Sequence, residues 1–333
     1  MKKIFEKGTN NFRLVKILVM ALLVLAIFTN GSAIQPGQIR LIAYLFPELG
    51  VMALGMMLAM ISGGIDLTVV AVADLTGILG CMLLKALMPS NANILLQILI
   101  FLFTVAVTLL IGAICGAFSG LLIAKVGIPA MVATLGASDI YLGLAVGLTK
   151  GSSISGIPPI LNNVVSYQIL GIIPLTTVVF ALCASFVAFM LTKTASGYKI
   201  YMIGSNKTAA RYSGLDVDRI TITTYALSGC FAAVSGLLMC GHFNSARSDF
   251  GKSYLMPTIL ICVLAGVNPN GGAGKVSGLV LSVIILQTLS SGFAMFPNIS
   301  DYYKNLIWGL VLIAVMAANI ISSRKHHQAS RQT

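Results

Sequence analysis

The sequence predicts an all-α integral membrane protein with about ten transmembrane helices. Of its 333 residues, 57% are hydrophobic and only 9% are charged, whereas soluble domains carry roughly 25% charged residues. Apolar runs recur along the chain, each near the ~20 residues that a helix needs to cross the hydrocarbon layer. Only helices and closed barrels satisfy their own backbone in lipid, and the sequence lacks the alternating pattern of barrel strands. We therefore expect one transmembrane domain over residues 1–333.

Ten apolar segments are candidate spans. They are approximately 14–30, 40–61, 66–87, 94–124, 129–149, 169–192, 220–240, 254–268, 275–296 and 303–321. The segment 254–268 is short for a span, and 94–124 is long enough to tilt or break. The N-terminus is basic and then apolar, like a signal peptide. Because no small-residue cleavage site precedes Asn30 and more spans follow, we interpret it as an uncleaved first span.

The net charge of +12 is explained by orientation in the bilayer rather than by nucleic-acid binding. The basic patches lack interleaved aromatic residues and a soluble fold to present them, which argues against nucleic acid. With the N-terminus placed inside, the inside segments hold 15 Lys and Arg and the outside segments hold 6. Positive residues accumulate on the cytoplasmic side, so this bias predicts that both termini, the polar tail 323–333 and the loop 193–219 are cytoplasmic.

The loop 193–219 is the polar segment best placed to meet a soluble partner. Within it, SNKTAARYSG is typical of a short helix, because Ser205 or Asn206 can cap its start and Gly214 is a natural stop. We expect Ala209 and Ala210 to allow close approach of the partner. Arg211 is expected to face acidic groups on that partner, with Tyr201 packed beneath the helix. The alternative is that a polytopic protein carries basic cytoplasmic loops for orientation alone.

The stretch GYKIYMIGSNKTAARYSG resembles the cytoplasmic coupling loop of bacterial ABC permeases for ribose-type sugars and autoinducer-2. The matching positions are Gly197, Tyr198, Tyr201, Gly204, Asn206, Ala209, Ala210, Arg211 and Gly214. Thr208 stands where that family usually has glutamate. If Ser205 is the cap, Thr208 lies three residues on, where glutamate would complete a capping box. The resemblance implies that this loop couples the permease to an ATPase.

A second landmark, SGGIDLTVVAVADLTG at residues 62–77, predicts a broken helix. Gly63 and Gly64 interrupt one helix, and Asp66 stands at the start of the next. One interpretation is that Asp66 only caps that helix. The other is that the break exposes polar backbone to a cavity or a partner, as in transporters. The stretch resembles the GGIDLSVG motif of the same permeases and departs from it at Val70.

Ionisable residues inside apolar spans are costly and usually face protein or water. Asp74 and Asp139 are two such residues. The stretch before Asp139, PAMVATLGAS, resembles another segment of the permease family, so Thr134, Ser138 and Asp139 are candidates for a polar path. The alternative is that these side chains join helices through hydrogen bonds. Asp74 matches no position of the family motif.

The stretch AGVNPNGGAGKVSG at residues 265–278 looks like a phosphate-binding loop but lacks its requirements. Pro269 occupies the place of the first glycine, and Val276 that of the Ser or Thr after the lysine. We therefore expect no ATP binding by this device. The stretch resembles a glycine-rich turn between two late spans of the permeases, formed here by Gly271, Gly272 and Gly274. Leu255, shortly before it, replaces an acidic residue of the family.

The resemblance covers residues 40–320 and implies a type II, vitamin B12-permease-like importer fold in the bacterial inner membrane. It implies three kinds of partner besides the lipid bilayer: a second permease copy or paralogue, two cytoplasmic ATP-binding domains, and an extracytoplasmic solute-binding protein. ATP would be bound by the partner, and this chain would hold no cofactor. The six cysteines lack metal-ligand spacing and no catalytic motif is present, so we expect neither a metal site nor an enzyme. An ion-coupled secondary transporter and a non-transporting scaffold or receptor subunit remain alternatives.

Overall fold

The computed structural model describes residues 2–29, 31–89, 91–296, 303 and 306–317. Its α-helices are α1 (Lys2–Phe28), α2 (Pro36–Ile61), α3 (Thr68–Leu87), α4 (Ile94–Leu121), α5 (Ala130–Thr149), α6 (Pro159–Ser166), α7 (Leu175–Lys193), α8 (Ala195–Ser205), α9 (Lys207–Tyr212), α10 (Val217–Phe243), α11 (Leu255–Leu264) and α12 (Val276–Ala294). Shorter elements are the 3-10 turns η1 (Ser32–Ile34) and η3 (Phe250–Tyr254), the π-helical turn η2 (Leu122–Val126), and the antiparallel strands β1 (Gln168–Ile169) and β2 (Ile173–Pro174).

Eight of the described helices are long and apolar enough to cross a membrane: α1 to α5, α7, α10 and α12. This confirms an all-α polytopic membrane protein. The remaining two predicted spans correspond to shorter apolar helices, Phe250–Leu264 and Leu306–Ala317. The end of the last predicted span, residues 318–321, and the tail 323–333 lie outside the described residues.

The predicted span 169–192 begins too early. Residues 168–174 form the β1–β2 hairpin, with Gln168 opposite Pro174 and Ile169 opposite Ile173. Leu170 and Gly171 both have positive φ, at 54° and 67°, which turns the chain sharply. The membrane helix α7 therefore begins only at Leu175, although hydropathy alone does not separate the hairpin from it.

The protein core is built around α2 and α10. Every residue of α2 from Phe46 to Ile61 is buried, and α10 packs against α2, α3 and α4. The α4–α10 crossing is close because glycines meet there. A Cβ atom on Gly229 would lie only 2.0 Å from the carbonyl oxygen of Gly112. Small residues at such crossings let membrane helices pack backbone to backbone.

Two buried carboxylates hold the segment in front of the short helix α11. The carboxylate of Asp74 on α3 accepts hydrogen bonds from the Gly251 N–H, at 3.0 and 3.2 Å. The Tyr254 hydroxyl donates to the Glu48 carboxylate on α2. These donors satisfy carboxylates that would otherwise be costly in the protein interior. Asp74 therefore has a structural role, as a link between α3 and η3.

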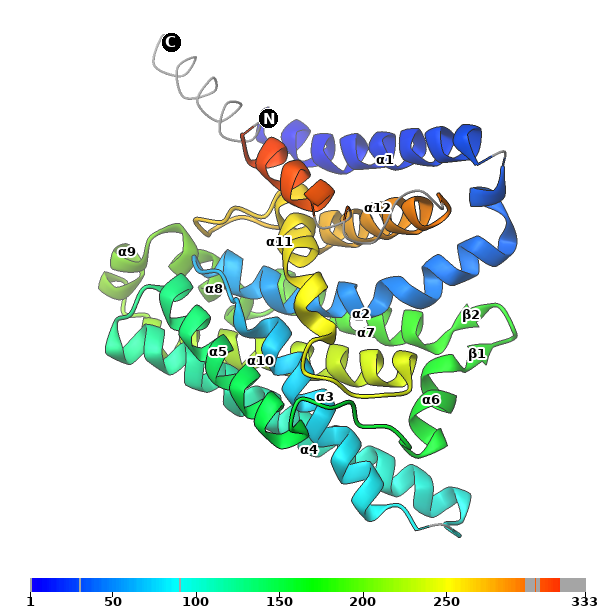
Figure 1. The fold of residues 1–333 in the computed structure, drawn as a ribbon. Helices are drawn as coiled ribbons and strands as arrows, with labels where there is room; N and C mark the ends of the chain where they lie inside the picture. Colours follow the sequence, from blue (N-terminus) through cyan, green and yellow to red (C-terminus); the bar gives the residue numbers. More distant parts are fainter. Residues whose placement is uncertain (1, 30, 90, 297–302, 304–305, 318–333) are drawn as a thin grey trace.

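The helical bundle has two opposite ends, each with its own short elements (Figure 1). Helices α8 and α9 lie at one end, here called the α9 end, and α6 with the β1–β2 hairpin lies at the other. Helix α7 runs between them, because it follows β2 directly and leads into α8. On the sides of the bundle, α1 packs against α12, and α5 packs against α3.

Candidate functional site

The break between α2 and α3 is a hydrogen-bonded junction at the α9 end. Asp66 is buried, and its Oδ1 accepts hydrogen bonds from the backbone N–H and the hydroxyl of Thr68 in the first turn of α3, at 3.0 and 2.5 Å. Its Oδ2 accepts from the Ser228 hydroxyl of α10 at 2.7 Å. Asp66 thus binds the first N–H of α3, whose N-cap residue is Leu67 and not Asp66, and also ties the break to α10.

The residues expected to form a polar path on α5 are separated by the structure. Thr134 is buried, and its hydroxyl donates to the carbonyl oxygen of Ile65 at 3.0 Å, so it belongs to the break. Ser138 is half-buried and Asp139 is exposed. Thr134 therefore links α5 to the non-helical break between α2 and α3, whereas Asp139 lies on the outer surface of the monomer.

Three glycine-containing stretches, each singled out in the sequence, meet at one point. A Cβ atom on Gly204 of α8 would lie 1.8 Å from the carbonyl oxygen of Ile61, at the end of α2, and 2.5 Å from the Gly272 nitrogen. The Gly272 N–H donates to that Ile61 oxygen at 2.9 Å. A Cβ atom on Gly271 would lie 2.8 Å from the Gly63 Cα atom. We call this contact of Gly63, Gly204, Gly271 and Gly272 the glycine junction.

The remaining predicted glycines surround the glycine junction. The Tyr201 hydroxyl of α8 donates to the Gly274 carbonyl oxygen at 2.7 Å. Burial raises the pKa of Tyr201 above its ordinary value, so the hydroxyl keeps its proton at neutral pH. Gly64 lies against the Tyr225 hydroxyl of α10, which would be 2.4 Å from a Cβ atom there. Substitution at any of these positions would therefore push neighbouring backbone or side chains apart.

The beginning of α8 is packed closely against the end of α7. A Cβ atom on Gly197 would lie 2.2 Å from the Met190 carbonyl oxygen. The Thr194 side chain accepts a hydrogen bond from the Gly197 N–H at 3.3 Å and so caps α8. Tyr198 points outward and is 70% exposed. Gly197 thus sets the angle between α7 and α8, and Tyr198 is available to a partner.

Helix α9 begins and ends where the sequence predicted, with two corrections. Of the two candidate caps, Asn206 is the one used: its Oδ1 accepts from the Ala209 N–H at 2.9 Å. The Ser205 hydroxyl instead donates to the Tyr201 carbonyl oxygen. Thr208 is consequently not in the capping-box position. Gly214 follows the helix with φ of 80°, a conformation that side chains with a Cβ atom disfavour.

The second correction concerns which face of α9 is free. Ala210 is only 2% exposed and packs with Ile203 and Val217. Its direction was predicted wrongly: it holds α9 against the protein instead of facing outward. Ala209 is exposed and lies beside a groove between α8 and α9.

That groove has a volume of about 350 Å³ and is lined by Tyr198, Tyr201, Met202, Ser205, Asn206, Ala209, Ala210 and Ser213. Its lining contains two tyrosines and a methionine but no charged residue. Tyrosine and methionine are enriched at protein interfaces and charged residues are depleted there, although the serines and alanines that make up half of this lining are depleted as well. The groove is therefore an uncharged surface with both aromatic and small polar side chains.

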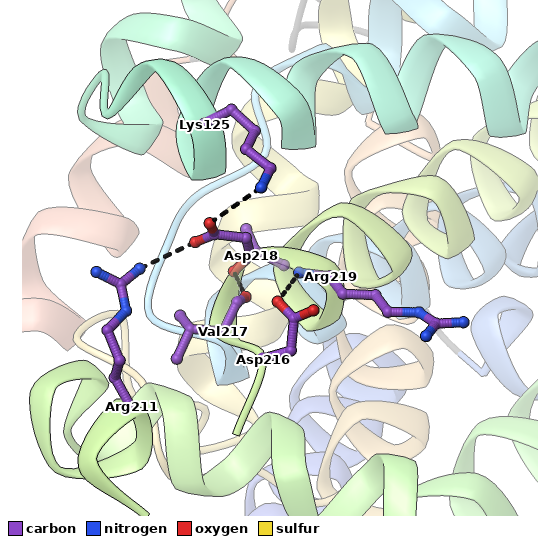
Figure 2. Close-up of polar contacts among 7 residues, drawn as sticks. Lys125, Arg211, Asp216, Val217, Asp218 and Arg219 are labelled. Atoms are coloured by element: carbon purple, nitrogen blue, oxygen red, sulfur yellow. Dashed lines mark hydrogen bonds and ion pairs between the residues drawn. The ribbon is translucent and has the colours of Figure 1, made fainter. Parts of the chain in front are cut away.

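Arg211 is paired within the chain, contrary to the expectation that it faces a partner's acidic groups. Its guanidinium binds Asp218 in the first turn of α10 at 3.0 Å, and Lys125 of η2 approaches the same carboxylate at 3.5 Å (Figure 2). Neighbouring Asp216 caps α10 by accepting from the Arg219 N–H. Each exposed ion pair contributes only about 0–1 kcal/mol. Their geometric effect is to join α9, α10 and the α4–α5 connection through one carboxylate.

Sequence reasoning missed several residues of this site: Lys125, Asp218, Tyr225 and Ser228. For Asp218 a signal existed, because it is one of only two acidic residues in the basic loop 193–219. Tyr225 and Ser228 lie within the apolar helix α10, where tyrosine and serine are unremarkable. Only the three-dimensional contacts with Gly64 and Asp66 reveal their part.

Comparison with known proteins identifies the family. A family model described as branched-chain amino acid transport system / permease component matches residues 38–316. The autoinducer 2 import system permease protein LsrD of Salmonella typhi is 31% identical over 322 residues, which cover 93% of each chain. The protein of the same name from Photorhabdus laumondii is 32% identical and covers 95% of this chain and 92% of its own. No solved structure is significantly similar to the chain. The chain thus belongs to this family of ABC transporter permease components.

Proposed function

We propose that this chain is the membrane permease subunit of an ATP-driven importer for a small sugar or sugar-like solute, with autoinducer 2 as the first candidate. The relatives that are similar over nearly the whole chain are named as autoinducer 2 import permeases. The chain would form the translocation path, and the ATP-binding subunits would supply the energy. The single observation that carries a coupled permease is the glycine junction, because it joins the exposed α8–α9 segment to the break between two membrane helices.

In this proposal the groove between α8 and α9 receives a cytoplasmic ATP-binding subunit. A displacement of α8 would act on Ile61 and Gly63 directly, since Gly204 leaves no space between them. From the break, Thr134 leads to α5 and Ser228 leads to α10 through hydrogen bonds. Closely packed backbone transmits displacement because such contacts have little freedom to deform. The nine matched positions of the loop would thus serve coupling in two ways. Tyr198 and Ala209 would contact the ATP-binding subunit at the surface, and Gly204 would transmit the displacement to the glycine junction.

The second permease would lie against α5. Asp139 is exposed on this helix, which is long and apolar enough to span the membrane. A carboxylate in such a helix is costly against lipid and is usually covered by protein or water. A second copy or a paralogue would cover Asp139 with protein, and the translocation path between the two chains would supply water. An extracytoplasmic solute-binding protein would deliver the solute at the end opposite α9.

The proposed orientation places the α9 end and both termini in the cytoplasm of a bacterial inner membrane. We expect a cysteine at Ser205 to resist a membrane-impermeant thiol reagent in intact cells and to react after the membrane is opened and the ATP-binding subunits are removed from the groove that Ser205 lines. A cysteine at Ser153 should react in intact cells, because it is exposed in the α5–α6 connection at the other end. If only the cysteine at position 205 is labelled in intact cells, the α9 end faces outward and the proposed orientation is wrong.

Reconstitution tests the transport function. The chain is placed in proteoliposomes with its ATP-binding and solute-binding partners, and uptake of labelled autoinducer 2 or ribose is measured. We expect uptake that requires ATP and persists when ionophores collapse the proton and sodium gradients. Uptake that is independent of ATP but lost with an ion gradient would support the secondary transporter. Absence of uptake for every small polyol and sugar tested would support a scaffold.

A further inference from the structure

The β1–β2 hairpin presents an apolar tip at the end of the molecule opposite α9 (Figure 1). Leu170 is 89% exposed, and Ile172 and Ile173 are exposed beside it. The base is closed by the Leu175 N–H, which donates to the Tyr167 carbonyl oxygen at 2.8 Å. The hairpin thus holds three large aliphatic side chains away from the protein core.

The backbone conformation of the turn is unfavourable for leucine. Leu170 has φ of 54°, a left-handed conformation that favours glycine or asparagine. A leucine in this conformation is strained and gains no burial within the described residues to compensate. Burial of the Leu170 side chain in another medium would compensate for this strain.

The position of the hairpin relative to the bilayer follows from α7. This helix has 19 residues, which corresponds to about 28 Å and nearly equals the ~30 Å hydrocarbon thickness. Because α7 starts at Leu175, one residue after β2, the hairpin lies at the membrane boundary. The Thr177 hydroxyl fixes this end of α7 by donating to the Ala43 carbonyl oxygen of α2 at 2.6 Å.

Charge and neighbouring surface favour lipid over a soluble protein as the occupant. No charged residue occurs between Lys150 and Lys193, so the hairpin offers no ionic contact to a partner. The helix that follows continues the apolar exposure with Leu182, Phe186 and Phe189 at helical spacing. Tyr167, also exposed at the base, is a residue type enriched at membrane–water interfaces.

We infer that the β1–β2 hairpin inserts its tip, Leu170 with Ile172 and Ile173, into the boundary between headgroups and acyl chains of the leaflet opposite the α9 end. The hairpin thereby fixes the depth of α7 and of the neighbouring external segment in the bilayer. Since it carries no charge, the insertion depends on apolar contact and is insensitive to the fraction of anionic lipid.

Single-tryptophan fluorescence tests this inference. The native Trp308 is replaced by phenylalanine, and tryptophan is then introduced as Leu170→Trp or Ile172→Trp, the second variant avoiding the positive φ of position 170. Ser153→Trp is the matched control, because Ser153 is exposed in the same external segment. The full chain is placed in phosphatidylcholine vesicles whose acyl chains are brominated near the headgroup or near the methyl end, with and without phosphatidylglycerol.

We expect blue-shifted emission from the hairpin tryptophans. Lipid brominated near the headgroup should quench them about twofold more than the control, as suits a side chain that enters only about 5–10 Å. Phosphatidylglycerol should change neither value. The inference is overturned if aqueous iodide quenches both hairpin variants as strongly as Ser153→Trp and brominated lipid does not. Shielding that arises only on addition of a solute-binding protein would also overturn it, in favour of a protein contact.

Discussion

A Gly204→Ala permease should lose most of its ATP-driven uptake, although the change adds a single methyl group. Alanine favours a helix by about 1 kcal/mol over glycine, so propensity alone predicts a more stable α8. The new Cβ atom would, however, lie 1.8 Å from the Ile61 carbonyl oxygen and 2.5 Å from the Gly272 nitrogen. These are backbone atoms and cannot turn aside as a side chain does. Overpacking of this kind typically costs about 1–3 kcal/mol. This cost exceeds the gain in helix propensity, so we expect the substitution to push α8 away from α2.

The measurements are uptake in proteoliposomes and the melting temperature of the purified chain. Gly37→Ala is the matched control, since Gly37 also lies in a helix and a Cβ atom there has no neighbour within 4 Å. The control should keep full uptake and gain up to about 1 kcal/mol of stability. If Gly204→Ala transports as well as wild type, the glycine junction does not transmit coupling.

The sequence identifies the members of the glycine junction but does not show that they meet. Paired glycines between apolar runs indicate a helix break or a tight turn on local grounds. Gly63, Gly204 and Gly271 are far apart in the chain, and hydropathy contains no information on which helix ends are neighbours. The requirement for glycine comes from packing of backbone against backbone, which only the folded chain reveals.

The predictions from the sequence for the hairpin and for α9 differ from the structure for different physical reasons. Residues 169–174 fall within a predicted span because isoleucine and leucine are equally apolar in a membrane helix and in an exposed hairpin. In α9, Ala209 and Ala210 differ in direction by about 100° around a helix of 3.6 residues per turn. Which of the two faces the protein depends on where Ile203 and Val217 lie. Arg211 pairs within the chain because the turn at Gly214 leads into α10 and brings Asp218 within reach, a contact that the sequence of the loop does not reveal.

The second large effect is expected at the groove between α8 and α9, where Ala209→Glu should abolish co-purification of the ATP-binding subunits. Ala209 is exposed and lines the uncharged groove beside Tyr198 and Met202. A glutamate there would lose its hydration when a partner covers the groove. Burial of an unpaired charge costs several kcal/mol, and every 1.4 kcal/mol weakens binding about tenfold. The variant should keep the wild-type melting temperature, because the exposed side chain makes no contact on which the fold depends.

Two neighbouring substitutions separate docking from folding. Thr208→Glu adds the same charge at an exposed position of the same short helix, where the resembling permeases usually carry glutamate. Its carboxylate lies in the first turn, where the helix dipole favours it, so co-purification should be retained. Ala210→Glu places the charge against Ile203 and Val217 and should lower the melting temperature as well as partner binding. Full co-purification of Ala209→Glu, with Thr208→Glu unchanged, would show that the ATP-binding subunits dock elsewhere. Loss of binding in all three variants would instead indicate that added charge anywhere on α9 is harmful, and the groove would lose its special role.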